Sequence, residues 1–325
     1  MATMQRHLAV RRLTDVGPDT RFELQRLLDR LNALEATLPT ASAQAALPTA
    51  SEQATVKAAR RLNRSSATLA TSVLLDSAVE HYRGSFKNKA MFTPLIISAL
   101  TLAVSAHGTA DKRPAAHDIR DLTYVLAALT GLAGTVFHVY NVTKRPGAMS
   151  WQNLFYGAPL GAPLAILLSG LLGFYSERVR DTSSSRSARV FGWPAGRALA
   201  ALTSGGLLGT AAEAGLLHFR GAYHDPFMLL PVTVPPVAAV LAGEAALGPK
   251  RRDRWFSRAW LRLTALLGFA GVGFHAWGVS RNMGGWRNWQ QNVLNGPPLP
   301  APPSFTGLAL AGLAALGLME DHPDA

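Results

Sequence analysis

Four histidines form two pairs that recur at the same spacing along the chain. His81 opens the segment His-Tyr-Arg-Gly-Ser-Phe, and His218 opens the similar segment His-Phe-Arg-Gly-Ala-Tyr. His138 and His275, separated by the same offset, end the segments Gly-Thr-Val-Phe-His and Gly-Val-Gly-Phe-His. Neutral imidazoles on facing helices are typical ligands of haem iron. We therefore expect the four histidines to ligate the iron of haem b. One haem would be held by His81 and His138 and another by His218 and His275, or each haem would be held by one histidine from each repeat.

Charged residues near these histidines extend the predicted chemistry. Arg83 and Arg220 each follow the first histidine of a pair by two residues, and we expect them to contact haem propionates or lipid headgroups. Asp76 and Glu213 precede the same histidines by five residues, about 500° of helix, so they point away from the imidazole on their own helix. Carboxylates inside a membrane are typical of proton transfer. We expect Asp76 and Glu213 to handle protons, for example at a quinone, or to make polar contacts between helices.

The offset that relates the histidines extends beyond them and indicates a tandem duplication. Met91 meets Met228 at this offset, and after a slip of two residues Asn153 meets Asn292. Small residues precede the second histidine of each half, where they suit close helix approach or leave room for a macrocycle. These residues are Gly131, Gly134, Gly268, Gly271 and Gly273.

The elements that carry these residues are predicted to be transmembrane helices. The chain of 325 residues is 48% hydrophobic and 16% charged, whereas soluble domains carry about 25% charged residues. Seven apolar segments approach the roughly 20 residues that cross a bilayer. They are 91–107, 121–141, 154–175, 198–219, 228–247, 260–280 and 304–319. The repeat adds an eighth, 65–82, which is too polar to be recognised alone. We expect an all-α integral membrane protein with eight transmembrane helices, arranged as two tandem parallel four-helix repeats.

The predicted organisation has three parts. Residues 1–59 form a cytoplasmic amphipathic helix and a flexible linker, 60–180 the first membrane repeat and 197–320 the second. The inner loops, in which we count Arg120 and Arg180, hold 13 basic residues against 8 in the outer loops. This asymmetry agrees with the positive-inside rule and places both termini in the cytoplasm. The composition, rich in Arg, Ala, Gly and Pro, favours a bacterial inner membrane.

The absence of cysteine excludes disulfides, iron–sulfur clusters and c-type haem attachment within the chain. We expect a haem b-binding anchor and electron-transfer subunit, rather than a stand-alone enzyme, that links an outer-face (periplasmic) oxidoreductase to the quinone pool. The aromatic and proline-rich segment 281–303 is the expected docking surface, unless it folds back over the bundle. Basic residues lie between apolar runs, so we expect contact with lipid and not with nucleic acid. Two alternatives are a cofactor-free anchor or assembly protein and a proton or metal-ion transporter.

Overall fold

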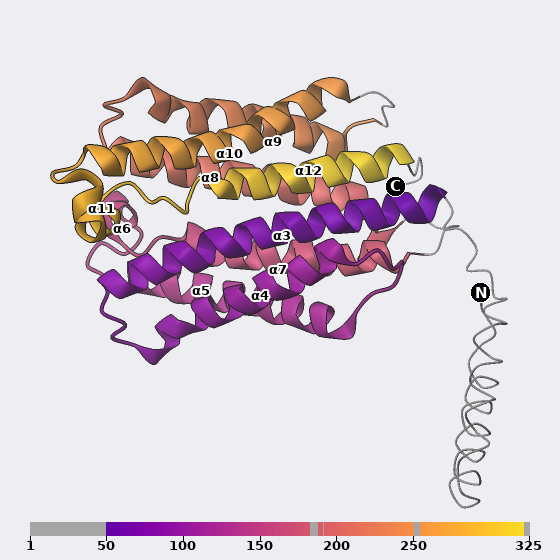
Figure 1. Cartoon of the computed structure of the whole chain (residues 1–325), viewed down its shortest axis with the longest axis horizontal. Coiled ribbons are helices and arrows are strands. Elements are labelled where there is room, and N and C mark those ends of the chain that lie inside the picture. Colours follow the sequence, from indigo (N-terminus) through magenta and orange to yellow (C-terminus); the bar gives the residue numbers. More distant parts are fainter. Residues whose placement is uncertain (1–49, 183–187, 191, 250–253, 322–325) are drawn as a thin grey trace, which may run out of the picture. The chain divides into compact units, whose positions relative to one another are not determined.

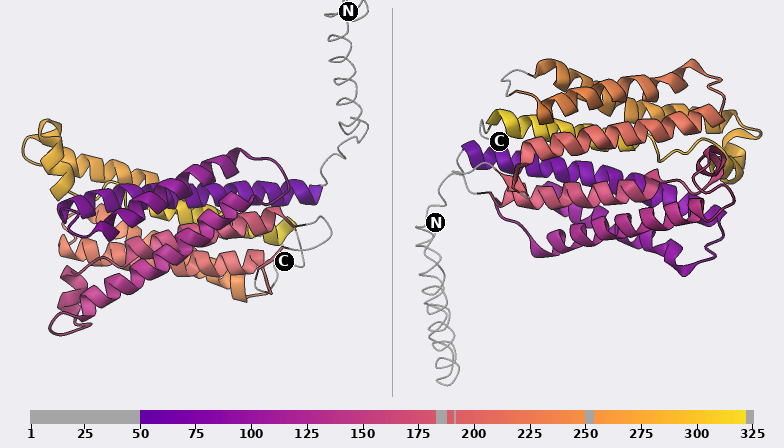
Figure 2. Two further views of the ribbon diagram at one scale, coloured as in Figure 1. Left: turned by 90° about the horizontal axis from the view of Figure 1, so that it is seen from below. Right: turned by 180° about the vertical axis from the view of Figure 1, so that it is seen from behind.

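The computed structural model describes residues 50–182, 188–190, 192–249 and 254–321. In these ranges eight long helices lie side by side (Figure 1, Figure 2). They are α3 (Ala50–Arg83), α4 (Thr93–Ala110), α5 (Asp118–Thr143), α7 (Gly161–Arg180), α8 (Ala195–Arg220), α9 (Leu230–Leu247), α10 (Trp255–Arg281) and α12 (Pro303–Asp321). The amphipathic helix and most of the linker expected within residues 1–49 lie outside the described residues.

Short elements connect the long helices. Three single-turn helices, η2 (Lys89–Phe92), η3 (Pro226–Leu229) and η4 (Gly285–Asn288), follow α3, α8 and α10. Two short α-helices, α6 (Trp151–Tyr156) and α11 (Trp289–Asn295), precede α7 and α12 and lie at the same end of the bundle (Figure 1). A two-residue hairpin, β1 (Arg189–Val190) with β2 (Trp193–Pro194), leads into α8. No other strand occurs in the described ranges.

The protein is an all-α membrane protein by the length and composition of its helices. Five helices in the described residues are long and apolar enough to cross a membrane. They are α4 together with η2, α5, α9 together with η3, α10, and α12. Only 17–22% of the most apolar window of α4, α5, α9 and α10 is buried inside the protein, whereas 61% of that of α12 is buried. Helices α4, α5, α9 and α10 therefore lie at the periphery, where apolar side chains face lipid.

The long helix α3 is less apolar because it packs against protein. It contacts α4, α7 and α12 along its length. Its polar side chains are satisfied there: Ser65 Oγ donates to the carbonyl oxygen of Gly307 on α12 at 2.5 Å, and Ser66 Oγ donates to that of Ser169 on α7 at 2.8 Å. Both serines are fully buried. A helix enclosed by other helices needs no apolar outer face, so hydropathy alone does not detect it.

The turns after α3 and α8 have the same backbone conformation. Ser85 and Phe86 have φ angles of 56° and 43°, and Ala222 and Tyr223 have 55° and 46°. These pairs of non-glycine residues occupy the left-handed region, which is uncommon. The following single-turn helix is capped by a side chain in both cases, since Asn88 Oδ1 accepts from the Ala90 N–H and Asp225 Oδ1 from the Phe227 N–H. The two segments, which the repeat aligns, therefore fold alike.

Two predicted boundaries are wrong. Helix α3 begins at Ala50, so the last ten residues of the expected linker 1–59 are helical. The predicted span 154–175 begins in α6, is interrupted at Gly157, and resumes as α7 at Gly161. The interruption follows from Pro159, because a residue before proline is disfavoured in helical conformation and proline donates no backbone hydrogen bond.

Candidate functional site

The first histidine of each pair ties the end of its helix to the next turn. His81 Nδ1 lies 2.6 Å from the carbonyl oxygen of Met91, and His218 Nδ1 lies 2.7 Å from that of Met228. A carbonyl oxygen only accepts hydrogen bonds, so each Nδ1 carries the proton. Each imidazole is therefore held in the tautomer whose Nε2 has a free lone pair.

The second histidine of each pair also bonds to a backbone carbonyl, in the segment that connects its helix to the next long helix. His138 Nδ1 lies 2.5 Å from the carbonyl oxygen of Pro159, and His275 Nδ1 lies 2.6 Å from that of Pro298. These prolines stand just before α7 and α12 and just after the short helices α6 and α11. All four imidazoles therefore lie at the end of the bundle where α6 and α11 are seen in Figure 1.

His81 and His138 lie on α3 and α5, and His218 and His275 lie on α8 and α10. The helices that carry a pair are bridged by the same two neighbours: α4 and α7 pack against both α3 and α5, and α9 and α12 against both α8 and α10. Among the described residues, no group of three or more His, Asp or Glu side chains is placed to hold a metal ion. These shared neighbours place His81 and His138 in one four-helix unit, and His218 and His275 in the other.

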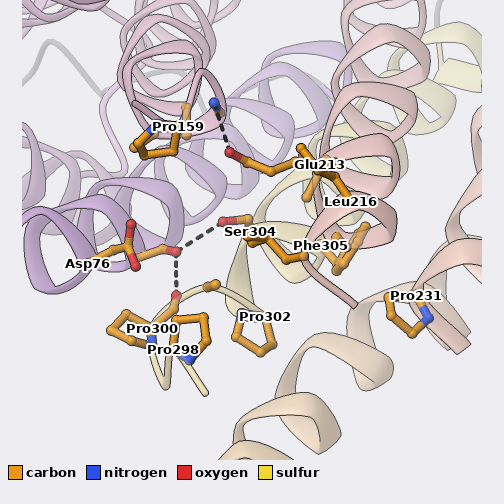
Figure 3. Close-up of a pocket in the computed structure, with 18 of the residues that line it drawn as sticks. Asp76, Pro159, Glu213, Leu216, Pro231, Pro298, Pro300, Pro302, Ser304 and Phe305 are labelled. Atoms are coloured by element: carbon orange, nitrogen blue, oxygen red, sulfur yellow. Dashed lines mark hydrogen bonds between the residues drawn. The ribbon is translucent and has the colours of Figure 1, made fainter. Parts of the chain in front are cut away.

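A large central cavity borders the second pair. It has a volume of about 2670 Å³, and its walls include His218 on α8 and His275 on α10. Asp76 on α3 and Glu213 on α8 line the same cavity (Figure 3). Typical small-molecule sites measure about 300–1,000 Å³, so the central cavity has room for more than one ligand.

The two carboxylates sit among backbone groups of proline-rich segments. Glu213 Oε1 accepts the Gly161 N–H at 3.0 Å, at the N-terminus of α7, a bond that either an ionised or a protonated carboxyl group can accept. Beside Asp76, Ser72 Oγ donates to the carbonyl oxygen of Pro300 at 2.5 Å and lies 3.0 Å from Ser304 Oγ (Figure 3). Both carboxylates face neighbouring helices, and neither is a partner of the imidazole on its own helix.

The two predicted arginines lie at the outer end of the central cavity but contact other side chains. Arg83 Nη1 donates to Glu80 Oε1 at 2.7 Å, and both side chains are substantially exposed. The Arg220 guanidinium lies 5.6 Å from the ring centroids of Phe155 and of Tyr156. Within the described ranges neither arginine is bonded to a histidine, so their assignment to cofactor propionates stays a prediction.

Four of the predicted glycines serve close helix packing, and one of them, Gly271, also lines the central cavity. A Cβ atom at Gly131 would overlap the backbone of Leu167 on α7, at 2.7 Å from its Cα. At Gly268 the Cβ atom would lie 2.9 Å from the carbonyl oxygen of Pro302, ahead of α12. The glycines one turn further on, Gly134 and Gly271, likewise contact proline rings. Of the five, only Gly273 faces open space.

Sequence reasoning missed a buried ionic cluster at the opposite end of the bundle. Arg120 is 1% exposed and donates to both Glu177 oxygens at 3.0 and 2.9 Å and to Asp111 Oδ2 at 2.8 Å. Arg180 is fully buried and donates to the carbonyl oxygens of Gly108, Asp111 and Arg113. Arg120 lies in the first turn of α5 and Arg180 is the last residue of α7, so their assignment to inner loops is wrong. The available signal was Glu177, a carboxylate at the end of an apolar segment.

No protein-family model, curated protein or solved structure matches the chain. The function is therefore inferred from the geometry of the site itself. The features that enter this inference are the two anchored imidazole pairs, the central cavity and the two carboxylates.

Proposed function

We propose that the chain is an eight-span membrane protein that holds one b-type haem between the imidazoles of each histidine pair and passes electrons from an outer-face protein partner toward quinone. The observation that carries this proposal is that the same anchored imidazole arrangement occurs twice, with both rings of each pair in the same tautomer. Histidines that bind metal through Nε2 characteristically donate their Nδ1–H to a backbone carbonyl. A bound haem would supply one-electron redox chemistry.

The donor set suits haem better than a structural zinc ion. The two neutral imidazoles of a pair would hold a haem iron, whereas structural zinc takes four protein ligands. In the second half, His218 and His275 also border the central cavity, so space for a macrocycle exists beside them. The backbone bonds to Met228 and Pro298 fix the two rings before any ligand binds, which reduces the cost of binding.

The eight spans and the duplication are supported by the arrangement of the halves. The inner helices α3, α7 and α8, which are not among the five candidate spans, pack against α12 and the apolar outer helices, so they can cross a bilayer as well. The matched turns, single-turn helices and histidine bonds recur at the offset that relates the sequences. With both termini cytoplasmic in a bacterial inner membrane, the imidazoles lie toward the periplasmic face.

The segment 281–303 is the proposed docking surface for the partner. It folds around Asn292, whose Nδ2 donates to the carbonyl oxygens of Met283 and Gly285 at 3.2 and 2.8 Å. Trp286 and Trp289 are 51% and 60% exposed on this folded segment. Exposed tryptophans on a rigid loop are typical of protein interfaces, although they also suit the lipid headgroup region.

Absorption spectroscopy of the purified protein, oxidised and then reduced with dithionite, tests the proposal. We expect a Soret band and two haems per chain, with one haem lost in His138→Ala and one in His275→Ala. His224→Ala is the matched control, because this exposed imidazole lies at the same end of the bundle outside both pairs. A haem-free wild-type protein, or an unchanged haem content in the double variant, would refute the proposal.

A cofactor-free anchor or assembly protein is the second candidate function. It is favoured by the histidine bonds themselves, since each imidazole already links a helix end to the next loop. On this account the histidine substitutions lower thermal stability equally in both halves, while the purified protein carries no iron. Metal analysis of the wild-type protein therefore separates the two candidates.

A further inference from the structure

The two interfaces between the halves are unequal, although the repeat predicts that they match. The offset relates α3 to α8 and α7 to α12, so the α3–α12 and α7–α8 contacts are equivalent positions. Helix α3 packs closely on α12 through the hydrogen bonds that join Ser65 to Gly307 and Ser72 to Ser304. Helices α7 and α8 touch over a much smaller area. The equivalents of the two serines are Leu202 and Gly209, which cannot donate side-chain hydrogen bonds, and the central cavity lies on this side.

From Ala198 to Gly209, the wall that α8 presents to the central cavity is apolar. A Cβ atom at Gly205 or Gly209 would meet nothing within 4 Å, and both glycines line the cavity. The cavity walls extend from Trp193, just before α8, to Arg220 at its end. A helix of 26 residues is about 39 Å long. The space therefore runs through most of the thickness of a bilayer and suits a long, flexible hydrocarbon chain.

Asp76 and Glu213 give this apolar space its polar end. In the described part of the chain, no ion pair joins either carboxylate to a basic side chain, and the nearby Arg83 is paired with Glu80. Glu213 and His218 are five residues apart on α8, so the carboxylate points about 140° away from the imidazole. The carboxylate side of the cavity is thus separate from its imidazole side.

We propose that the carboxylate side of the central cavity binds a quinone, with protonated Asp76 and Glu213 donating hydrogen bonds to its two ring oxygens. A quinone combines a flat head that bears two acceptors with a long prenyl chain, which matches both ends of the space. A phospholipid fits less well, because Asp76, Glu213 and the neighbouring Glu80 offer no positive charge to its anionic phosphate.

The reaction balances when the two carboxyl groups act as proton donors. The quinone takes two electrons, which originate in the outer-face dehydrogenase of the proposed function, and one proton from each carboxyl group. The products are a quinol and two carboxylates, which regain protons from water at the outer end of the cavity. The inference rests on the proposed function for the electrons alone, since the binding surface is made entirely by the chain.

Quenching of intrinsic tryptophan fluorescence by decylubiquinone measures binding in the purified full-length protein. We expect Gly209→Leu, which fills the cavity, to weaken binding at least tenfold. Gly273→Leu is the matched control, because this glycine also faces open space but does not line the central cavity. Glu213→Gln keeps an oxygen for the Gly161 N–H and an N–H donor for the quinone oxygen, so we expect it to keep binding, whereas Glu213→Leu removes the donor and should bind about tenfold more weakly. Asp76→Asn and Asp76→Leu are expected to differ in the same way.

The outcomes separate this inference from the haem proposal. Decylubiquinone binding by a protein that carries no haem supports the quinone site and refutes only the proposed function. Absence of binding, or equal binding by the Gly209→Leu and Gly273→Leu variants, overturns the quinone site whatever the haem content. Displacement of decylubiquinone by dihexanoylphosphatidylglycerol at equal concentration would assign the space to lipid and also overturn it.

Discussion

Removing Glu177 tests whether the buried ionic cluster behaves as one unit. In Glu177→Leu the fully buried guanidinium of Arg120 loses two hydrogen bonds and its main counter-charge, and the His117 N–H loses its acceptor. Breaking a buried ion pair by removing one partner costs about 3–5 kcal/mol. We expect the free-energy cost of Glu177→Leu to fall in this range. Asp111 is the one carboxylate that still pairs with Arg120, and it also pairs with Arg113.

The double variant Arg120→Ser/Glu177→Leu carries the residues of the equivalent positions in the second half, Ser257 and Leu316. It removes the buried Arg120 charge together with its partner, so we expect it to be more stable than Glu177→Leu alone. Arg113→Ala is the control, because this side chain is 67% exposed and such pairs contribute about 0–1 kcal/mol. Unfolding in detergent, followed by circular dichroism, gives the coupling energy. A cost below about 1 kcal/mol for Glu177→Leu, or additive costs in the double variant, would refute the reasoning.

Two further predictions concern packing and pH. The new methyl group in Gly131→Ala overlaps the backbone of Leu167 and should destabilise the protein by about 1–3 kcal/mol. Gly273→Ala should instead stabilise the protein by up to about 1 kcal/mol, because alanine has a higher helix propensity than glycine. Thermal melts that rank the two variants in the opposite order would contradict the packing. Hydrogen bonds from Arg113 and Arg120 hold the pKa of Asp111 below its usual range. The stabilisation is therefore present above the unfolded carboxyl pKa, about 3.9, and is lost as the pH falls through the folded value. Wild-type stability should drop more than that of Asp111→Asn in acid titrations, and parallel curves would be evidence against this role.

Most helices are predicted by the hydropathy of their own residues, whereas α3 is predicted only by the internal repeat. Hydropathy detects α4, α5, α9 and α10 because their side chains face outward. Residues 65–82 of α3 are recognised only through their likeness to α8, because Ser65 and Ser66 are polar residues buried against other helices. The start of α3 at Ala50 carries no comparable signal, since an Ala-rich stretch suits a linker as well as a helix.

The candidate site is predictable in its residue types but not in its contacts. The repeat identifies the four histidines, and helix geometry predicts that Asp76 and Glu213 point away from them. The carbonyl partners of the imidazoles lie 10–23 residues away in turns, and no periodic pattern encodes those distances. The central cavity depends on a difference between two interfaces, set by pairs such as Ser72 and Gly209. Side-chain periodicity along one helix does not reveal such a difference.

Single-cysteine labelling tests most directly whether the four imidazoles lie at one face of the membrane. The chain has no cysteine of its own, so each introduced thiol reports one position. Cysteines at the exposed residues Lys87, Lys144, His224 and Met283 follow the four helices that carry the histidines, and Lys112 marks the opposite end. We expect a membrane-impermeant maleimide to label the first four from one side and the cysteine at Lys112 only from the other. Labelling of any of the four from the side that exposes Lys112 would contradict the eight-span arrangement and the paired imidazole sites.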